Sequence, residues 1–265
     1  MATNEQMISI KPTAATQDEK RMNPTRQAAP RVDSSRRIAL VAGVLYLLTF
    51  VSIPTLVIYG QVKSADYILG AGPDTSAIIG GISEIIVALA GIGTAVVLFP
   101  ILKKQNESAA LGLVASRILE ASTIFVGVAF ILSVVTLRQA GAGADALVTS
   151  NALVSLYDRI FLLGPSFMPA IDDLLLGYLL YKSRLVPRAL SLIGLVGGPI
   201  LLVGYIAILF GLIGQHAPLA GLFAIPVALF EFSLGVWLVV KGFNPSAITS
   251  QTTTTSNLIA QPLVP

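Results

Sequence analysis

The chain has 265 residues, of which 54% are hydrophobic and 12% are charged, and its formal net charge is +3. A soluble globular domain carries about 25% charged residues, so this composition excludes an ordinary soluble protein and indicates a membrane protein. The sequence contains no cysteine, which excludes disulfides, thiolate metal sites and a cysteine nucleophile. The single histidine, His216, argues against a histidine metal site or a Ser-His-Asp triad, so we expect no metal and no cofactor.

The two ends of the chain are polar. Residues 1–37 are rich in Thr, Gln, Pro and Ala and become basic near their end. Segments with so few large apolar residues do not offset the entropy cost of ordering, so we predict a disordered basic cytoplasmic tail. The transmembrane domain is then expected at residues 38–242, and a polar cytoplasmic tail at residues 243–265.

Six apolar segments are long enough to cross a bilayer as helices, which requires about 20 apolar residues. Their predicted ranges are 38–59, 76–102, 108–137, 153–181, 189–213 and 219–240. The fold class is therefore predicted to be all-α, a polytopic membrane bundle of six transmembrane helices. Pro54 is expected to kink or fray the outer part of the first helix.

The fourth segment is irregular. It contains Pro165 and Pro169, each of which lacks a backbone donor and disfavours a continuous helix. We predict a kinked or broken helix there, with Asp158 near the outer surface. Asp172 and Asp173 are expected in the first turn of the second half, where the helix dipole favours negative charge.

Small residues form stripes that favour close helix packing. Gly80, Glu84 and Gly91 lie on one face of the second segment, so Glu84 is predicted to face protein and not lipid. Gly194 and Gly198 form a G-x-x-x-G pattern in the fifth segment, which permits close approach of helix backbones in lipid.

Basic residues gather on one side of the predicted bundle. They are Lys103, Lys104, Lys182, Arg184, Arg188 and Lys241. The opposite side holds Lys63 and Arg138, with Arg159 near its surface. The positive-inside rule then predicts that both termini are cytoplasmic. The basic loop at residues 182–188 is interpreted as a topology signal, with a lipid-headgroup site as the alternative.

Helix rise, about 1.5 Å per residue, permits a depth estimate for the buried charges. Arg117, Asp172 and Glu231 each lie nine residues from the basic end of their segment, which is ~14 Å into the membrane. On the same count, Glu120 lies at ~18 Å and Glu84 at ~24 Å. The sequence therefore predicts an intramembrane charged layer. Its members are Arg117, Glu120, Asp172, Asp173, Glu231 and, above them, Glu84.

One arginine can neutralise one or two carboxylates, so the other acids in this layer must be protonated, hydrated or bound to a cation. Arg117 is predicted to pair with Glu120 on its own helix, where the spacing puts both on one face. It is also predicted to pair with Asp172 or Asp173 across the bundle. Glu231 and Glu84 are left without an assigned cation.

Several local motifs resemble those of a known family. They are RIA at 37–39, LFP at 98–100, R-x-x-E-A at 117–121, YLLYKSRLVPR at 178–188, and Glu231 followed by WL at 237–238 and KG at 241–242. In order and spacing they resemble the bacterial multi-span membrane protein family called domain of unknown function 4386. The resemblance covers residues 36–243. It implies a multi-pass protein of the bacterial cytoplasmic (inner) membrane and supplies no catalytic residues.

Three functions compete on the sequence. A small proton-coupled carrier with a midplane acidic site fits acids beside a broken helix. A non-transporting scaffold or partner subunit, whose buried charges lock the helices together, fits equally. An intramembrane enzyme is third, because neighbouring residues such as Asp172 and Asp173 point about 100° apart on a helix. We expect no enzyme and no nucleic-acid binding. The expected partners are the lipid bilayer and a small solute, proton or cation.

Overall fold

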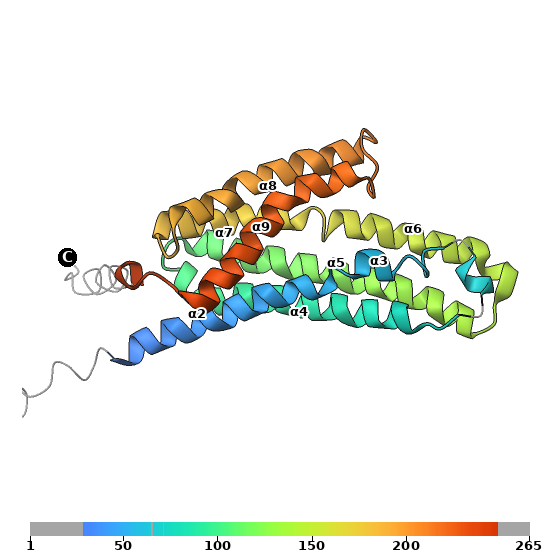
Figure 1. Ribbon diagram of the computed structural model, residues 1–265, viewed down its shortest axis with the longest axis horizontal. Helices are drawn as coiled ribbons and strands as arrows, with labels where there is room; N and C mark the ends of the chain where they lie inside the picture. Colours follow the sequence, from blue (N-terminus) through green and yellow to red (C-terminus); the bar gives the residue numbers. More distant parts are fainter. Residues whose placement is uncertain (1–28, 65, 71, 249–265) are drawn as a thin grey trace, which may run out of the picture.

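The structure is a computed structural model that describes residues 29–248, apart from residues 65 and 71. The described residues are mainly helical and contain no strand. In chain order the elements are α2 (Ala29–Thr49), η1 (Phe50–Ser52), α3 (Thr55–Ile58), η2 (Tyr67–Leu69), α4 (Thr75–Leu102), α5 (Glu107–Gln139), η3 (Gly143–Ala146), α6 (Leu147–Leu163), α7 (Met168–Ser183), α8 (Arg188–Leu209) and α9 (Pro218–Val240). Six of the resulting helical segments are long and apolar enough to cross a membrane, which confirms the predicted all-α, six-span bundle (Figure 1).

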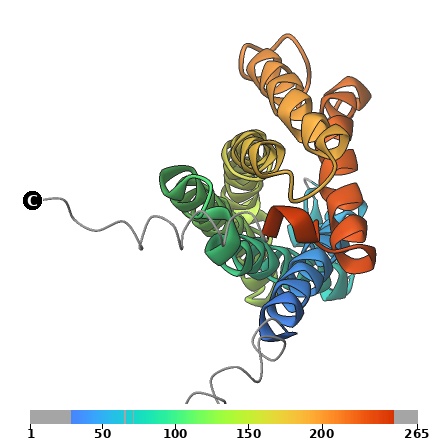
Figure 2. The same ribbon diagram turned by 90° about the vertical axis from the view of Figure 1, so that its left-hand side faces the viewer.

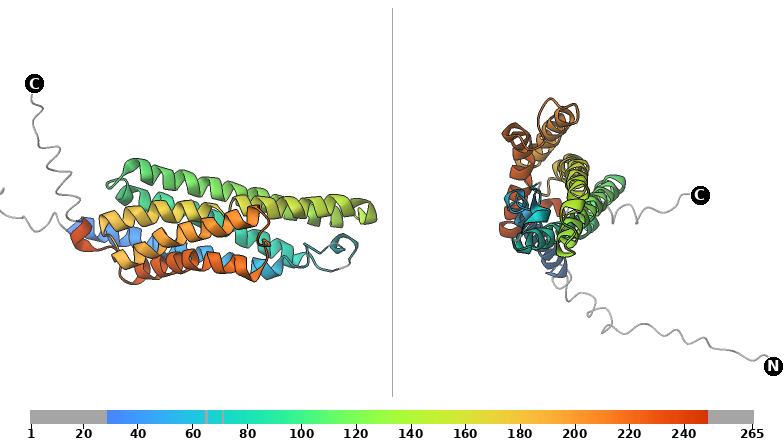
Figure 3. Two further views of the ribbon diagram at one scale, coloured as in Figure 1. Left: turned by 90° about the horizontal axis from the view of Figure 1, so that it is seen from above. Right: turned by 90° about the vertical axis from the view of Figure 1, so that its right-hand side faces the viewer.

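The bundle has two chemically different ends. We call the end that carries Lys103, Lys182 and Lys241 the basic end, and the opposite end, with Lys63 and Arg138, the far end. The start of α2 and the end of α9 both lie at the basic end (Figure 1). α5 has 33 residues and is about 50 Å long, whereas α8 has 22 and is about 33 Å long. At the far end α5 and α6 therefore run past the α8–α9 hairpin (Figure 3).

The helices pack in a defined order of neighbours. α4 packs against both α2 and α5, and α5 also contacts α6 and α7. The α8–α9 hairpin joins the bundle mainly through α7 and α2 and is inclined to α5 (Figures 1 and 2), while the turn at its tip contacts α6. The largest buried apolar cluster lies in the basic half and contains Tyr46, Leu102, Leu180 and Phe230. This half of the molecule is therefore the tightly packed one.

The first span begins earlier than predicted, and its outer part is interrupted near Pro54, as predicted. α2 begins at Ala29, inside the tail predicted to be disordered, and Arg36 donates to the carbonyl oxygens of Leu238 at 2.8 Å and Val239 at 2.6 Å. This contact fixes the helix to the end of α9 just before the apolar segment begins. The α-helix ends at Thr49, before Pro54, which caps the short α3.

The predicted tails lie mainly outside the described residues, at 1–28 and 249–265. Residues 243–248 are described, and they pack onto the bundle. Phe243 and Ala247 are buried, and the Asn244 amide donates to the carbonyl of Leu185 at 2.8 Å. These two apolar side chains therefore extend the core at the basic end beyond residue 242.

The fourth span is broken between α6 and α7. α6 ends at Leu163 and α7 begins at Met168, with Pro165 in the break and Pro169 in the first turn of α7. The first turn of α7 holds no acid. The prediction that Asp172 and Asp173 lie in that turn is therefore wrong, and the helix dipole has less influence on them than expected.

The glycines of the G-x-x-x-G pattern serve close helix packing. A Cβ atom at Gly198 would lie 2.8 Å from the Ala170 carbonyl oxygen and 2.9 Å from the Cγ of Leu174, both on α7. A Cβ at Gly194 would lie 2.6 Å from the ring of Phe230 on α9. α8 therefore approaches both neighbours more closely than a side chain permits.

The Gly198→Ala variant should lose thermal stability, because the added methyl group forces α8 away from α7. Overpacking of this kind costs about 1–3 kcal/mol. The measurement is the melting midpoint of the purified protein in detergent. Gly221→Ala on α9 is the matched control, since a Cβ there meets no atom within 4 Å. Equal melting of the two variants would contradict the packing role of Gly198.

Candidate functional site

Arg117 on α5 is the centre of a buried charge cluster. Its Nη1 lies 2.9 Å from Oε2 of Glu120, its Nε 3.3 Å from Oδ2 of Asp172, and its Nη2 2.5 Å from Oε1 of Glu231. These acids come from α5, α7 and α9. The side chain of Arg117 is 4% exposed and that of Asp172 is fully buried. One guanidinium thus connects three helices inside the bundle.

Asp173 completes this group, which we call the central cluster: Arg117, Glu120, Asp172, Asp173 and Glu231. Asp173 is 0% exposed and its electrostatic neighbours are the other four residues. The carboxyl oxygens of Asp172 and Asp173 have no hydrogen-bond partner of normal geometry among the described residues, although Ser116 lies near Asp172.

Charge balance limits the states that this cluster can adopt. Four carboxyl groups face one guanidinium, so full ionisation would leave three uncompensated negative charges away from water. Burying an unpaired ion costs several kcal/mol. The central cluster must therefore hold protons, a cation or water on its carboxyl groups.

Two further helices form the walls of the central cluster. Tyr46 on α2 is buried, and its ring centre lies 5.8 Å from Cζ of Arg117, within the range of a cation–π contact. A Cβ at Gly91 on α4 would lie 3.8 Å from Cδ of Arg117 and 4.0 Å from Oε2 of Glu120. Sequence reasoning missed the role of Tyr46, although a tyrosine within an apolar span is itself a signal, because its hydroxyl needs a polar partner.

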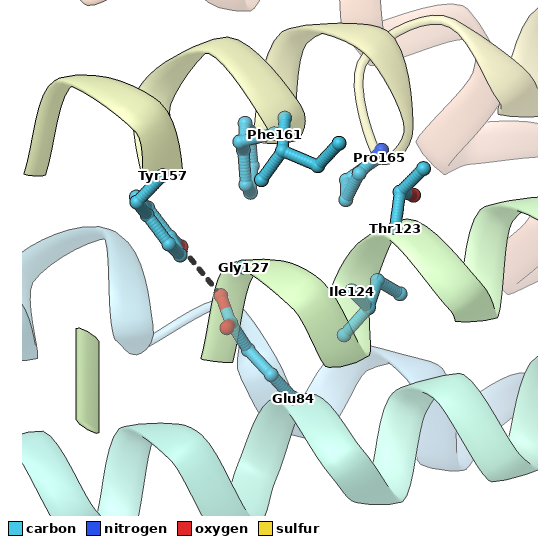
Figure 4. A pocket seen from close by; sticks show the side chains of 8 residues that line it. Glu84, Thr123, Ile124, Gly127, Tyr157, Phe161 and Pro165 are labelled. Atoms are coloured by element: carbon cyan, nitrogen blue, oxygen red, sulfur yellow. Dashed lines mark hydrogen bonds between the residues drawn. The ribbon is translucent and has the colours of Figure 1, made fainter. Parts of the chain in front are cut away.

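Glu84 forms a second, separate site. The Tyr157 hydroxyl donates to its Oε1 at 2.6 Å and the Tyr59 hydroxyl donates to its Oε2 at 3.2 Å. Figure 4 shows Tyr157 directed from α6 to Glu84 on α4. The two tyrosine rings meet edge to face, with centroids 5.5 Å apart. The ring of Tyr59 fits because Gly80 has no side chain, since a Cβ there would overlap it.

A small cavity adjoins the Glu84 site. Its volume is about 10 Å³, roughly the space of one water molecule. Thr123, Ile124 and Gly127 of α5 form one wall, and Pro165 of the α6–α7 break forms another (Figure 4). The break in the fourth span is therefore in direct contact with the surroundings of Glu84.

Charged groups lie between Glu84 and the far end. Nζ of Lys63 is 2.7 Å from Oδ1 of Asp158 and 4.4 Å from the ring centre of Tyr157. The α8–α9 turn also reaches Asp158, through a Gln215 hydrogen bond to its carbonyl at 2.9 Å and through His216, whose Nε2 is 3.8 Å from Oδ1. Polar groups thus connect the far surface to Tyr157 and Glu84.

A further group of polar contacts lies at the far end around Asp74, the residue before α4. Asp74 accepts hydrogen bonds from Tyr67 at 2.5 Å and Gln139 at 2.9 Å, and Arg138 lies 3.2 Å from it. These hydrogen bonds, with the charge of Arg138, lower the pKa of Asp74. Burial, and then the hydrogen bond to Asp74, raise the pKa of Tyr67 to about 12. Near neutral pH the contact therefore joins an ionised acid to a neutral phenol.

The structure separates the residues of the predicted layer into two groups. Arg117 pairs with Glu120 and Asp172, as the spacing and depth indicated, while Glu84 lies apart with its two tyrosines. The expectation that Glu231 has no cation is wrong, because α9 directs its carboxylate towards Arg117. Within the described part of the chain, no group of three His, Cys, Asp or Glu residues is arranged to hold a metal ion.

The Arg117→Leu variant should give a much lower folded yield, because it leaves three contacting acids buried without a cation. Removing one partner of a buried ion pair costs about 3–5 kcal/mol. Adding Asp172→Asn should recover part of the loss. The measurement is the monodisperse fraction after extraction, with exposed Arg159→Leu as the matched control. A parent-like yield for Arg117→Leu would show that this pairing does not support the fold.

Comparison with known proteins identifies a family but no characterised relative. No curated protein and no solved structure matches the chain. The family described as "Domain of unknown function (DUF4386)" matches residues 41–242, from α2 to the end of α9, and this range contains the central cluster and the Glu84 site. Because the match covers most of the chain, and agrees with the motifs read from the sequence, this protein belongs to the DUF4386 family.

Proposed function

We propose that this multi-pass membrane protein is a small proton-coupled carrier, and that the central cluster is its proton- or cation-binding site. The observation that carries the proposal is the excess of buried acid over buried base. Asp172 and Asp173 are fully buried and lack hydrogen-bond partners of normal geometry among the described residues. Such carboxyl groups are suited to take up and release a proton or to bind a cation.

The position of the cluster also supports transport. Asp172 and Asp173 follow the break between α6 and α7, and carriers commonly place their sites beside discontinuous helices near the bilayer midplane. The α8–α9 hairpin bears Glu231 and contacts the remaining helices mainly through α7 and α2. A rocking motion of this hairpin would change the distance between Glu231 and Arg117, and would so alter the charge balance of the cluster.

In this proposal Glu84 is the proton- or cation-binding site nearest the far end. It lies closer to the far end than the central cluster, and the Lys63–Asp158 pair stands between its tyrosine partner and the far surface. On α4 the small residues Ala88 and Gly91 separate Glu84 from Glu120. Transfer between the two sites would require water or a helix movement in this segment, because Ala88 packs in a buried apolar cluster with Ala121 and Ile124.

One observation favours a second candidate, a scaffold or partner subunit. The three ion pairs of Arg117 bridge α5, α7 and α9, which is also how buried charges fix helix positions. In that case the cluster would have a fixed charge state and no turnover. Neither candidate assigns a catalytic activity to the chain.

Asp173→Asn and Glu84→Gln should each abolish pH-dependent uptake while the protein remains folded, because both keep the side-chain shape and remove the titration. The measurement uses the parent and variants in reconstituted vesicles with an internal pH dye, under an imposed pH gradient and a broad panel of small solutes. Glu107→Gln is the matched control, since Glu107 is exposed at the start of α5. It should behave as the parent does.

The two candidates differ in this experiment. Under the scaffold alternative both substitutions leave vesicle behaviour unchanged and the protein equally stable. If the parent, both variants and the control give the same proton flux for every solute, the carrier proposal is rejected.

The proposal includes an orientation in the bacterial cytoplasmic membrane, with the basic end and both termini in the cytoplasm. Its support is the distribution of charge. The basic end holds Lys103, Lys104, Lys182, Arg184, Arg188 and Lys241, whereas Lys63 and Arg138 at the far end are each paired with an aspartate. Positively charged loops are retained on the cytoplasmic side during insertion.

Single cysteines test this orientation, because the native chain has none. Cysteines at Ser64 and Ala144, which are exposed at the far end, should react with an impermeant maleimide added to intact cells. A cysteine at Lys182, which is exposed at the basic end, should react only after the cells are opened. Labelling at position 182 in intact cells would overturn the orientation.

A further inference from the structure

An open hollow lies at the basic end, where the loop between α7 and α8 meets the segment that follows α9. Its volume is about 470 Å³. The side chains of Val186 and Phe243 are buried beside it, and the amide of Asn244 is bound to Leu185 across it. Trp237 of α9 forms part of the wall. Two chain segments far apart in sequence thus create one concave surface.

All charged residues that line this hollow are basic. Arg184, Arg188 and Lys241 line it, and no acid does. None of the three forms a salt bridge with a described residue. The guanidinium of Arg188 instead lies 5.0 Å from the ring centre of Tyr181. Three cations around one hollow with no acid among its lining residues make the local potential positive, and this potential attracts an anion.

The backbone at Arg184 provides an independent argument. Its φ is 55°, and it is the non-glycine residue with positive φ in the described part of the chain. It caps the end of α7 in the left-handed conformation, a position where glycine is the favoured residue and other side chains are strained. The chain thus has an arginine where glycine would give a more stable helix end, which indicates that the guanidinium itself has a use there.

We infer that this hollow binds the phosphate group of an anionic ligand, held by Arg184, Arg188 and Lys241. Guanidinium groups recognise phosphate through paired hydrogen bonds, and lysine adds a point charge. Two sources fit this chemistry, an anionic phospholipid headgroup and a soluble phosphate. The lipid is favoured by the surroundings, since Val240, which directly precedes Lys241, exposes an apolar side chain that suits an acyl chain. The inference does not depend on the proposed transport activity.

Trp237 is the single tryptophan of the chain, so its fluorescence reports binding in the hollow directly. The full-length protein in neutral detergent is titrated with phosphatidylglycerol, with phosphatidylcholine and with inorganic pyrophosphate. A saturable change with phosphatidylglycerol and none with phosphatidylcholine is expected. A response to pyrophosphate alone would identify a soluble phosphate as the ligand, whereas equal responses to the two lipids would overturn the site.

Two variants separate binding from folding. Arg184→Gly should melt at or above the temperature of the parent, because glycine relieves the left-handed strain, and should still bind roughly tenfold more weakly or worse. Lys241→Gln should weaken binding in the same direction. Lys104→Gln, an exposed lysine of the same end that does not line the hollow, is the control for general surface charge. Parent-like affinity in Arg184→Gly and Lys241→Gln, or an equal loss in Lys104→Gln, would refute the inference.

Discussion

The burial of Arg117 among four carboxyl groups is the interaction on which the rest of the bundle depends. A guanidinium cannot remain in an apolar interior without partners, and it is never deprotonated in proteins. α5, α7 and α9 must therefore meet at one depth and in one rotation. On α4, Gly91 lies opposite the pair, where a Cβ would be in van der Waals contact with Arg117 and Glu120. The same cluster holds four carboxyl groups for one guanidinium, and this excess of acid is what allows it to bind a proton.

Glu84 shows a different way to hold a buried acid. Two phenol groups donate to its oxygens, and among the described residues no cation forms a salt bridge with it. A carboxyl group held in this way can change its charge without breaking an ion pair. The break between α6 and α7 lies against this site through Pro165 and precedes Asp172 in the other cluster. One irregular segment thus contacts the Glu84 site and leads into α7, the helix that carries Asp172 and Asp173.

The two ends of the molecule differ in whether their basic residues are paired with acids. At the far end, Lys63 and Arg138 are matched by Asp158 and Asp74, so the surface there is locally balanced. At the basic end, the cations around the α7–α8 loop have no acidic counterpart among the residues that line the hollow. This asymmetry underlies both the proposed orientation in the membrane and the proposed phosphate site, because each rests on the cations of the basic end.

The sequence by itself determined the six spans, the break in the fourth and the Arg117–Glu120 pair, because apolar length, proline chemistry and helical spacing act within one segment. Only the tertiary structure decided that Glu231 reaches Arg117, that Tyr59 and Tyr157 hold Glu84, and that α2 begins at Ala29. Depth counted along a helix gives the height of a residue, but not the rotation of the helix about its axis or its tilt towards a neighbour. Those two quantities are set by packing between segments far apart in the chain, such as Gly80 against Tyr59 and Arg36 against the end of α9.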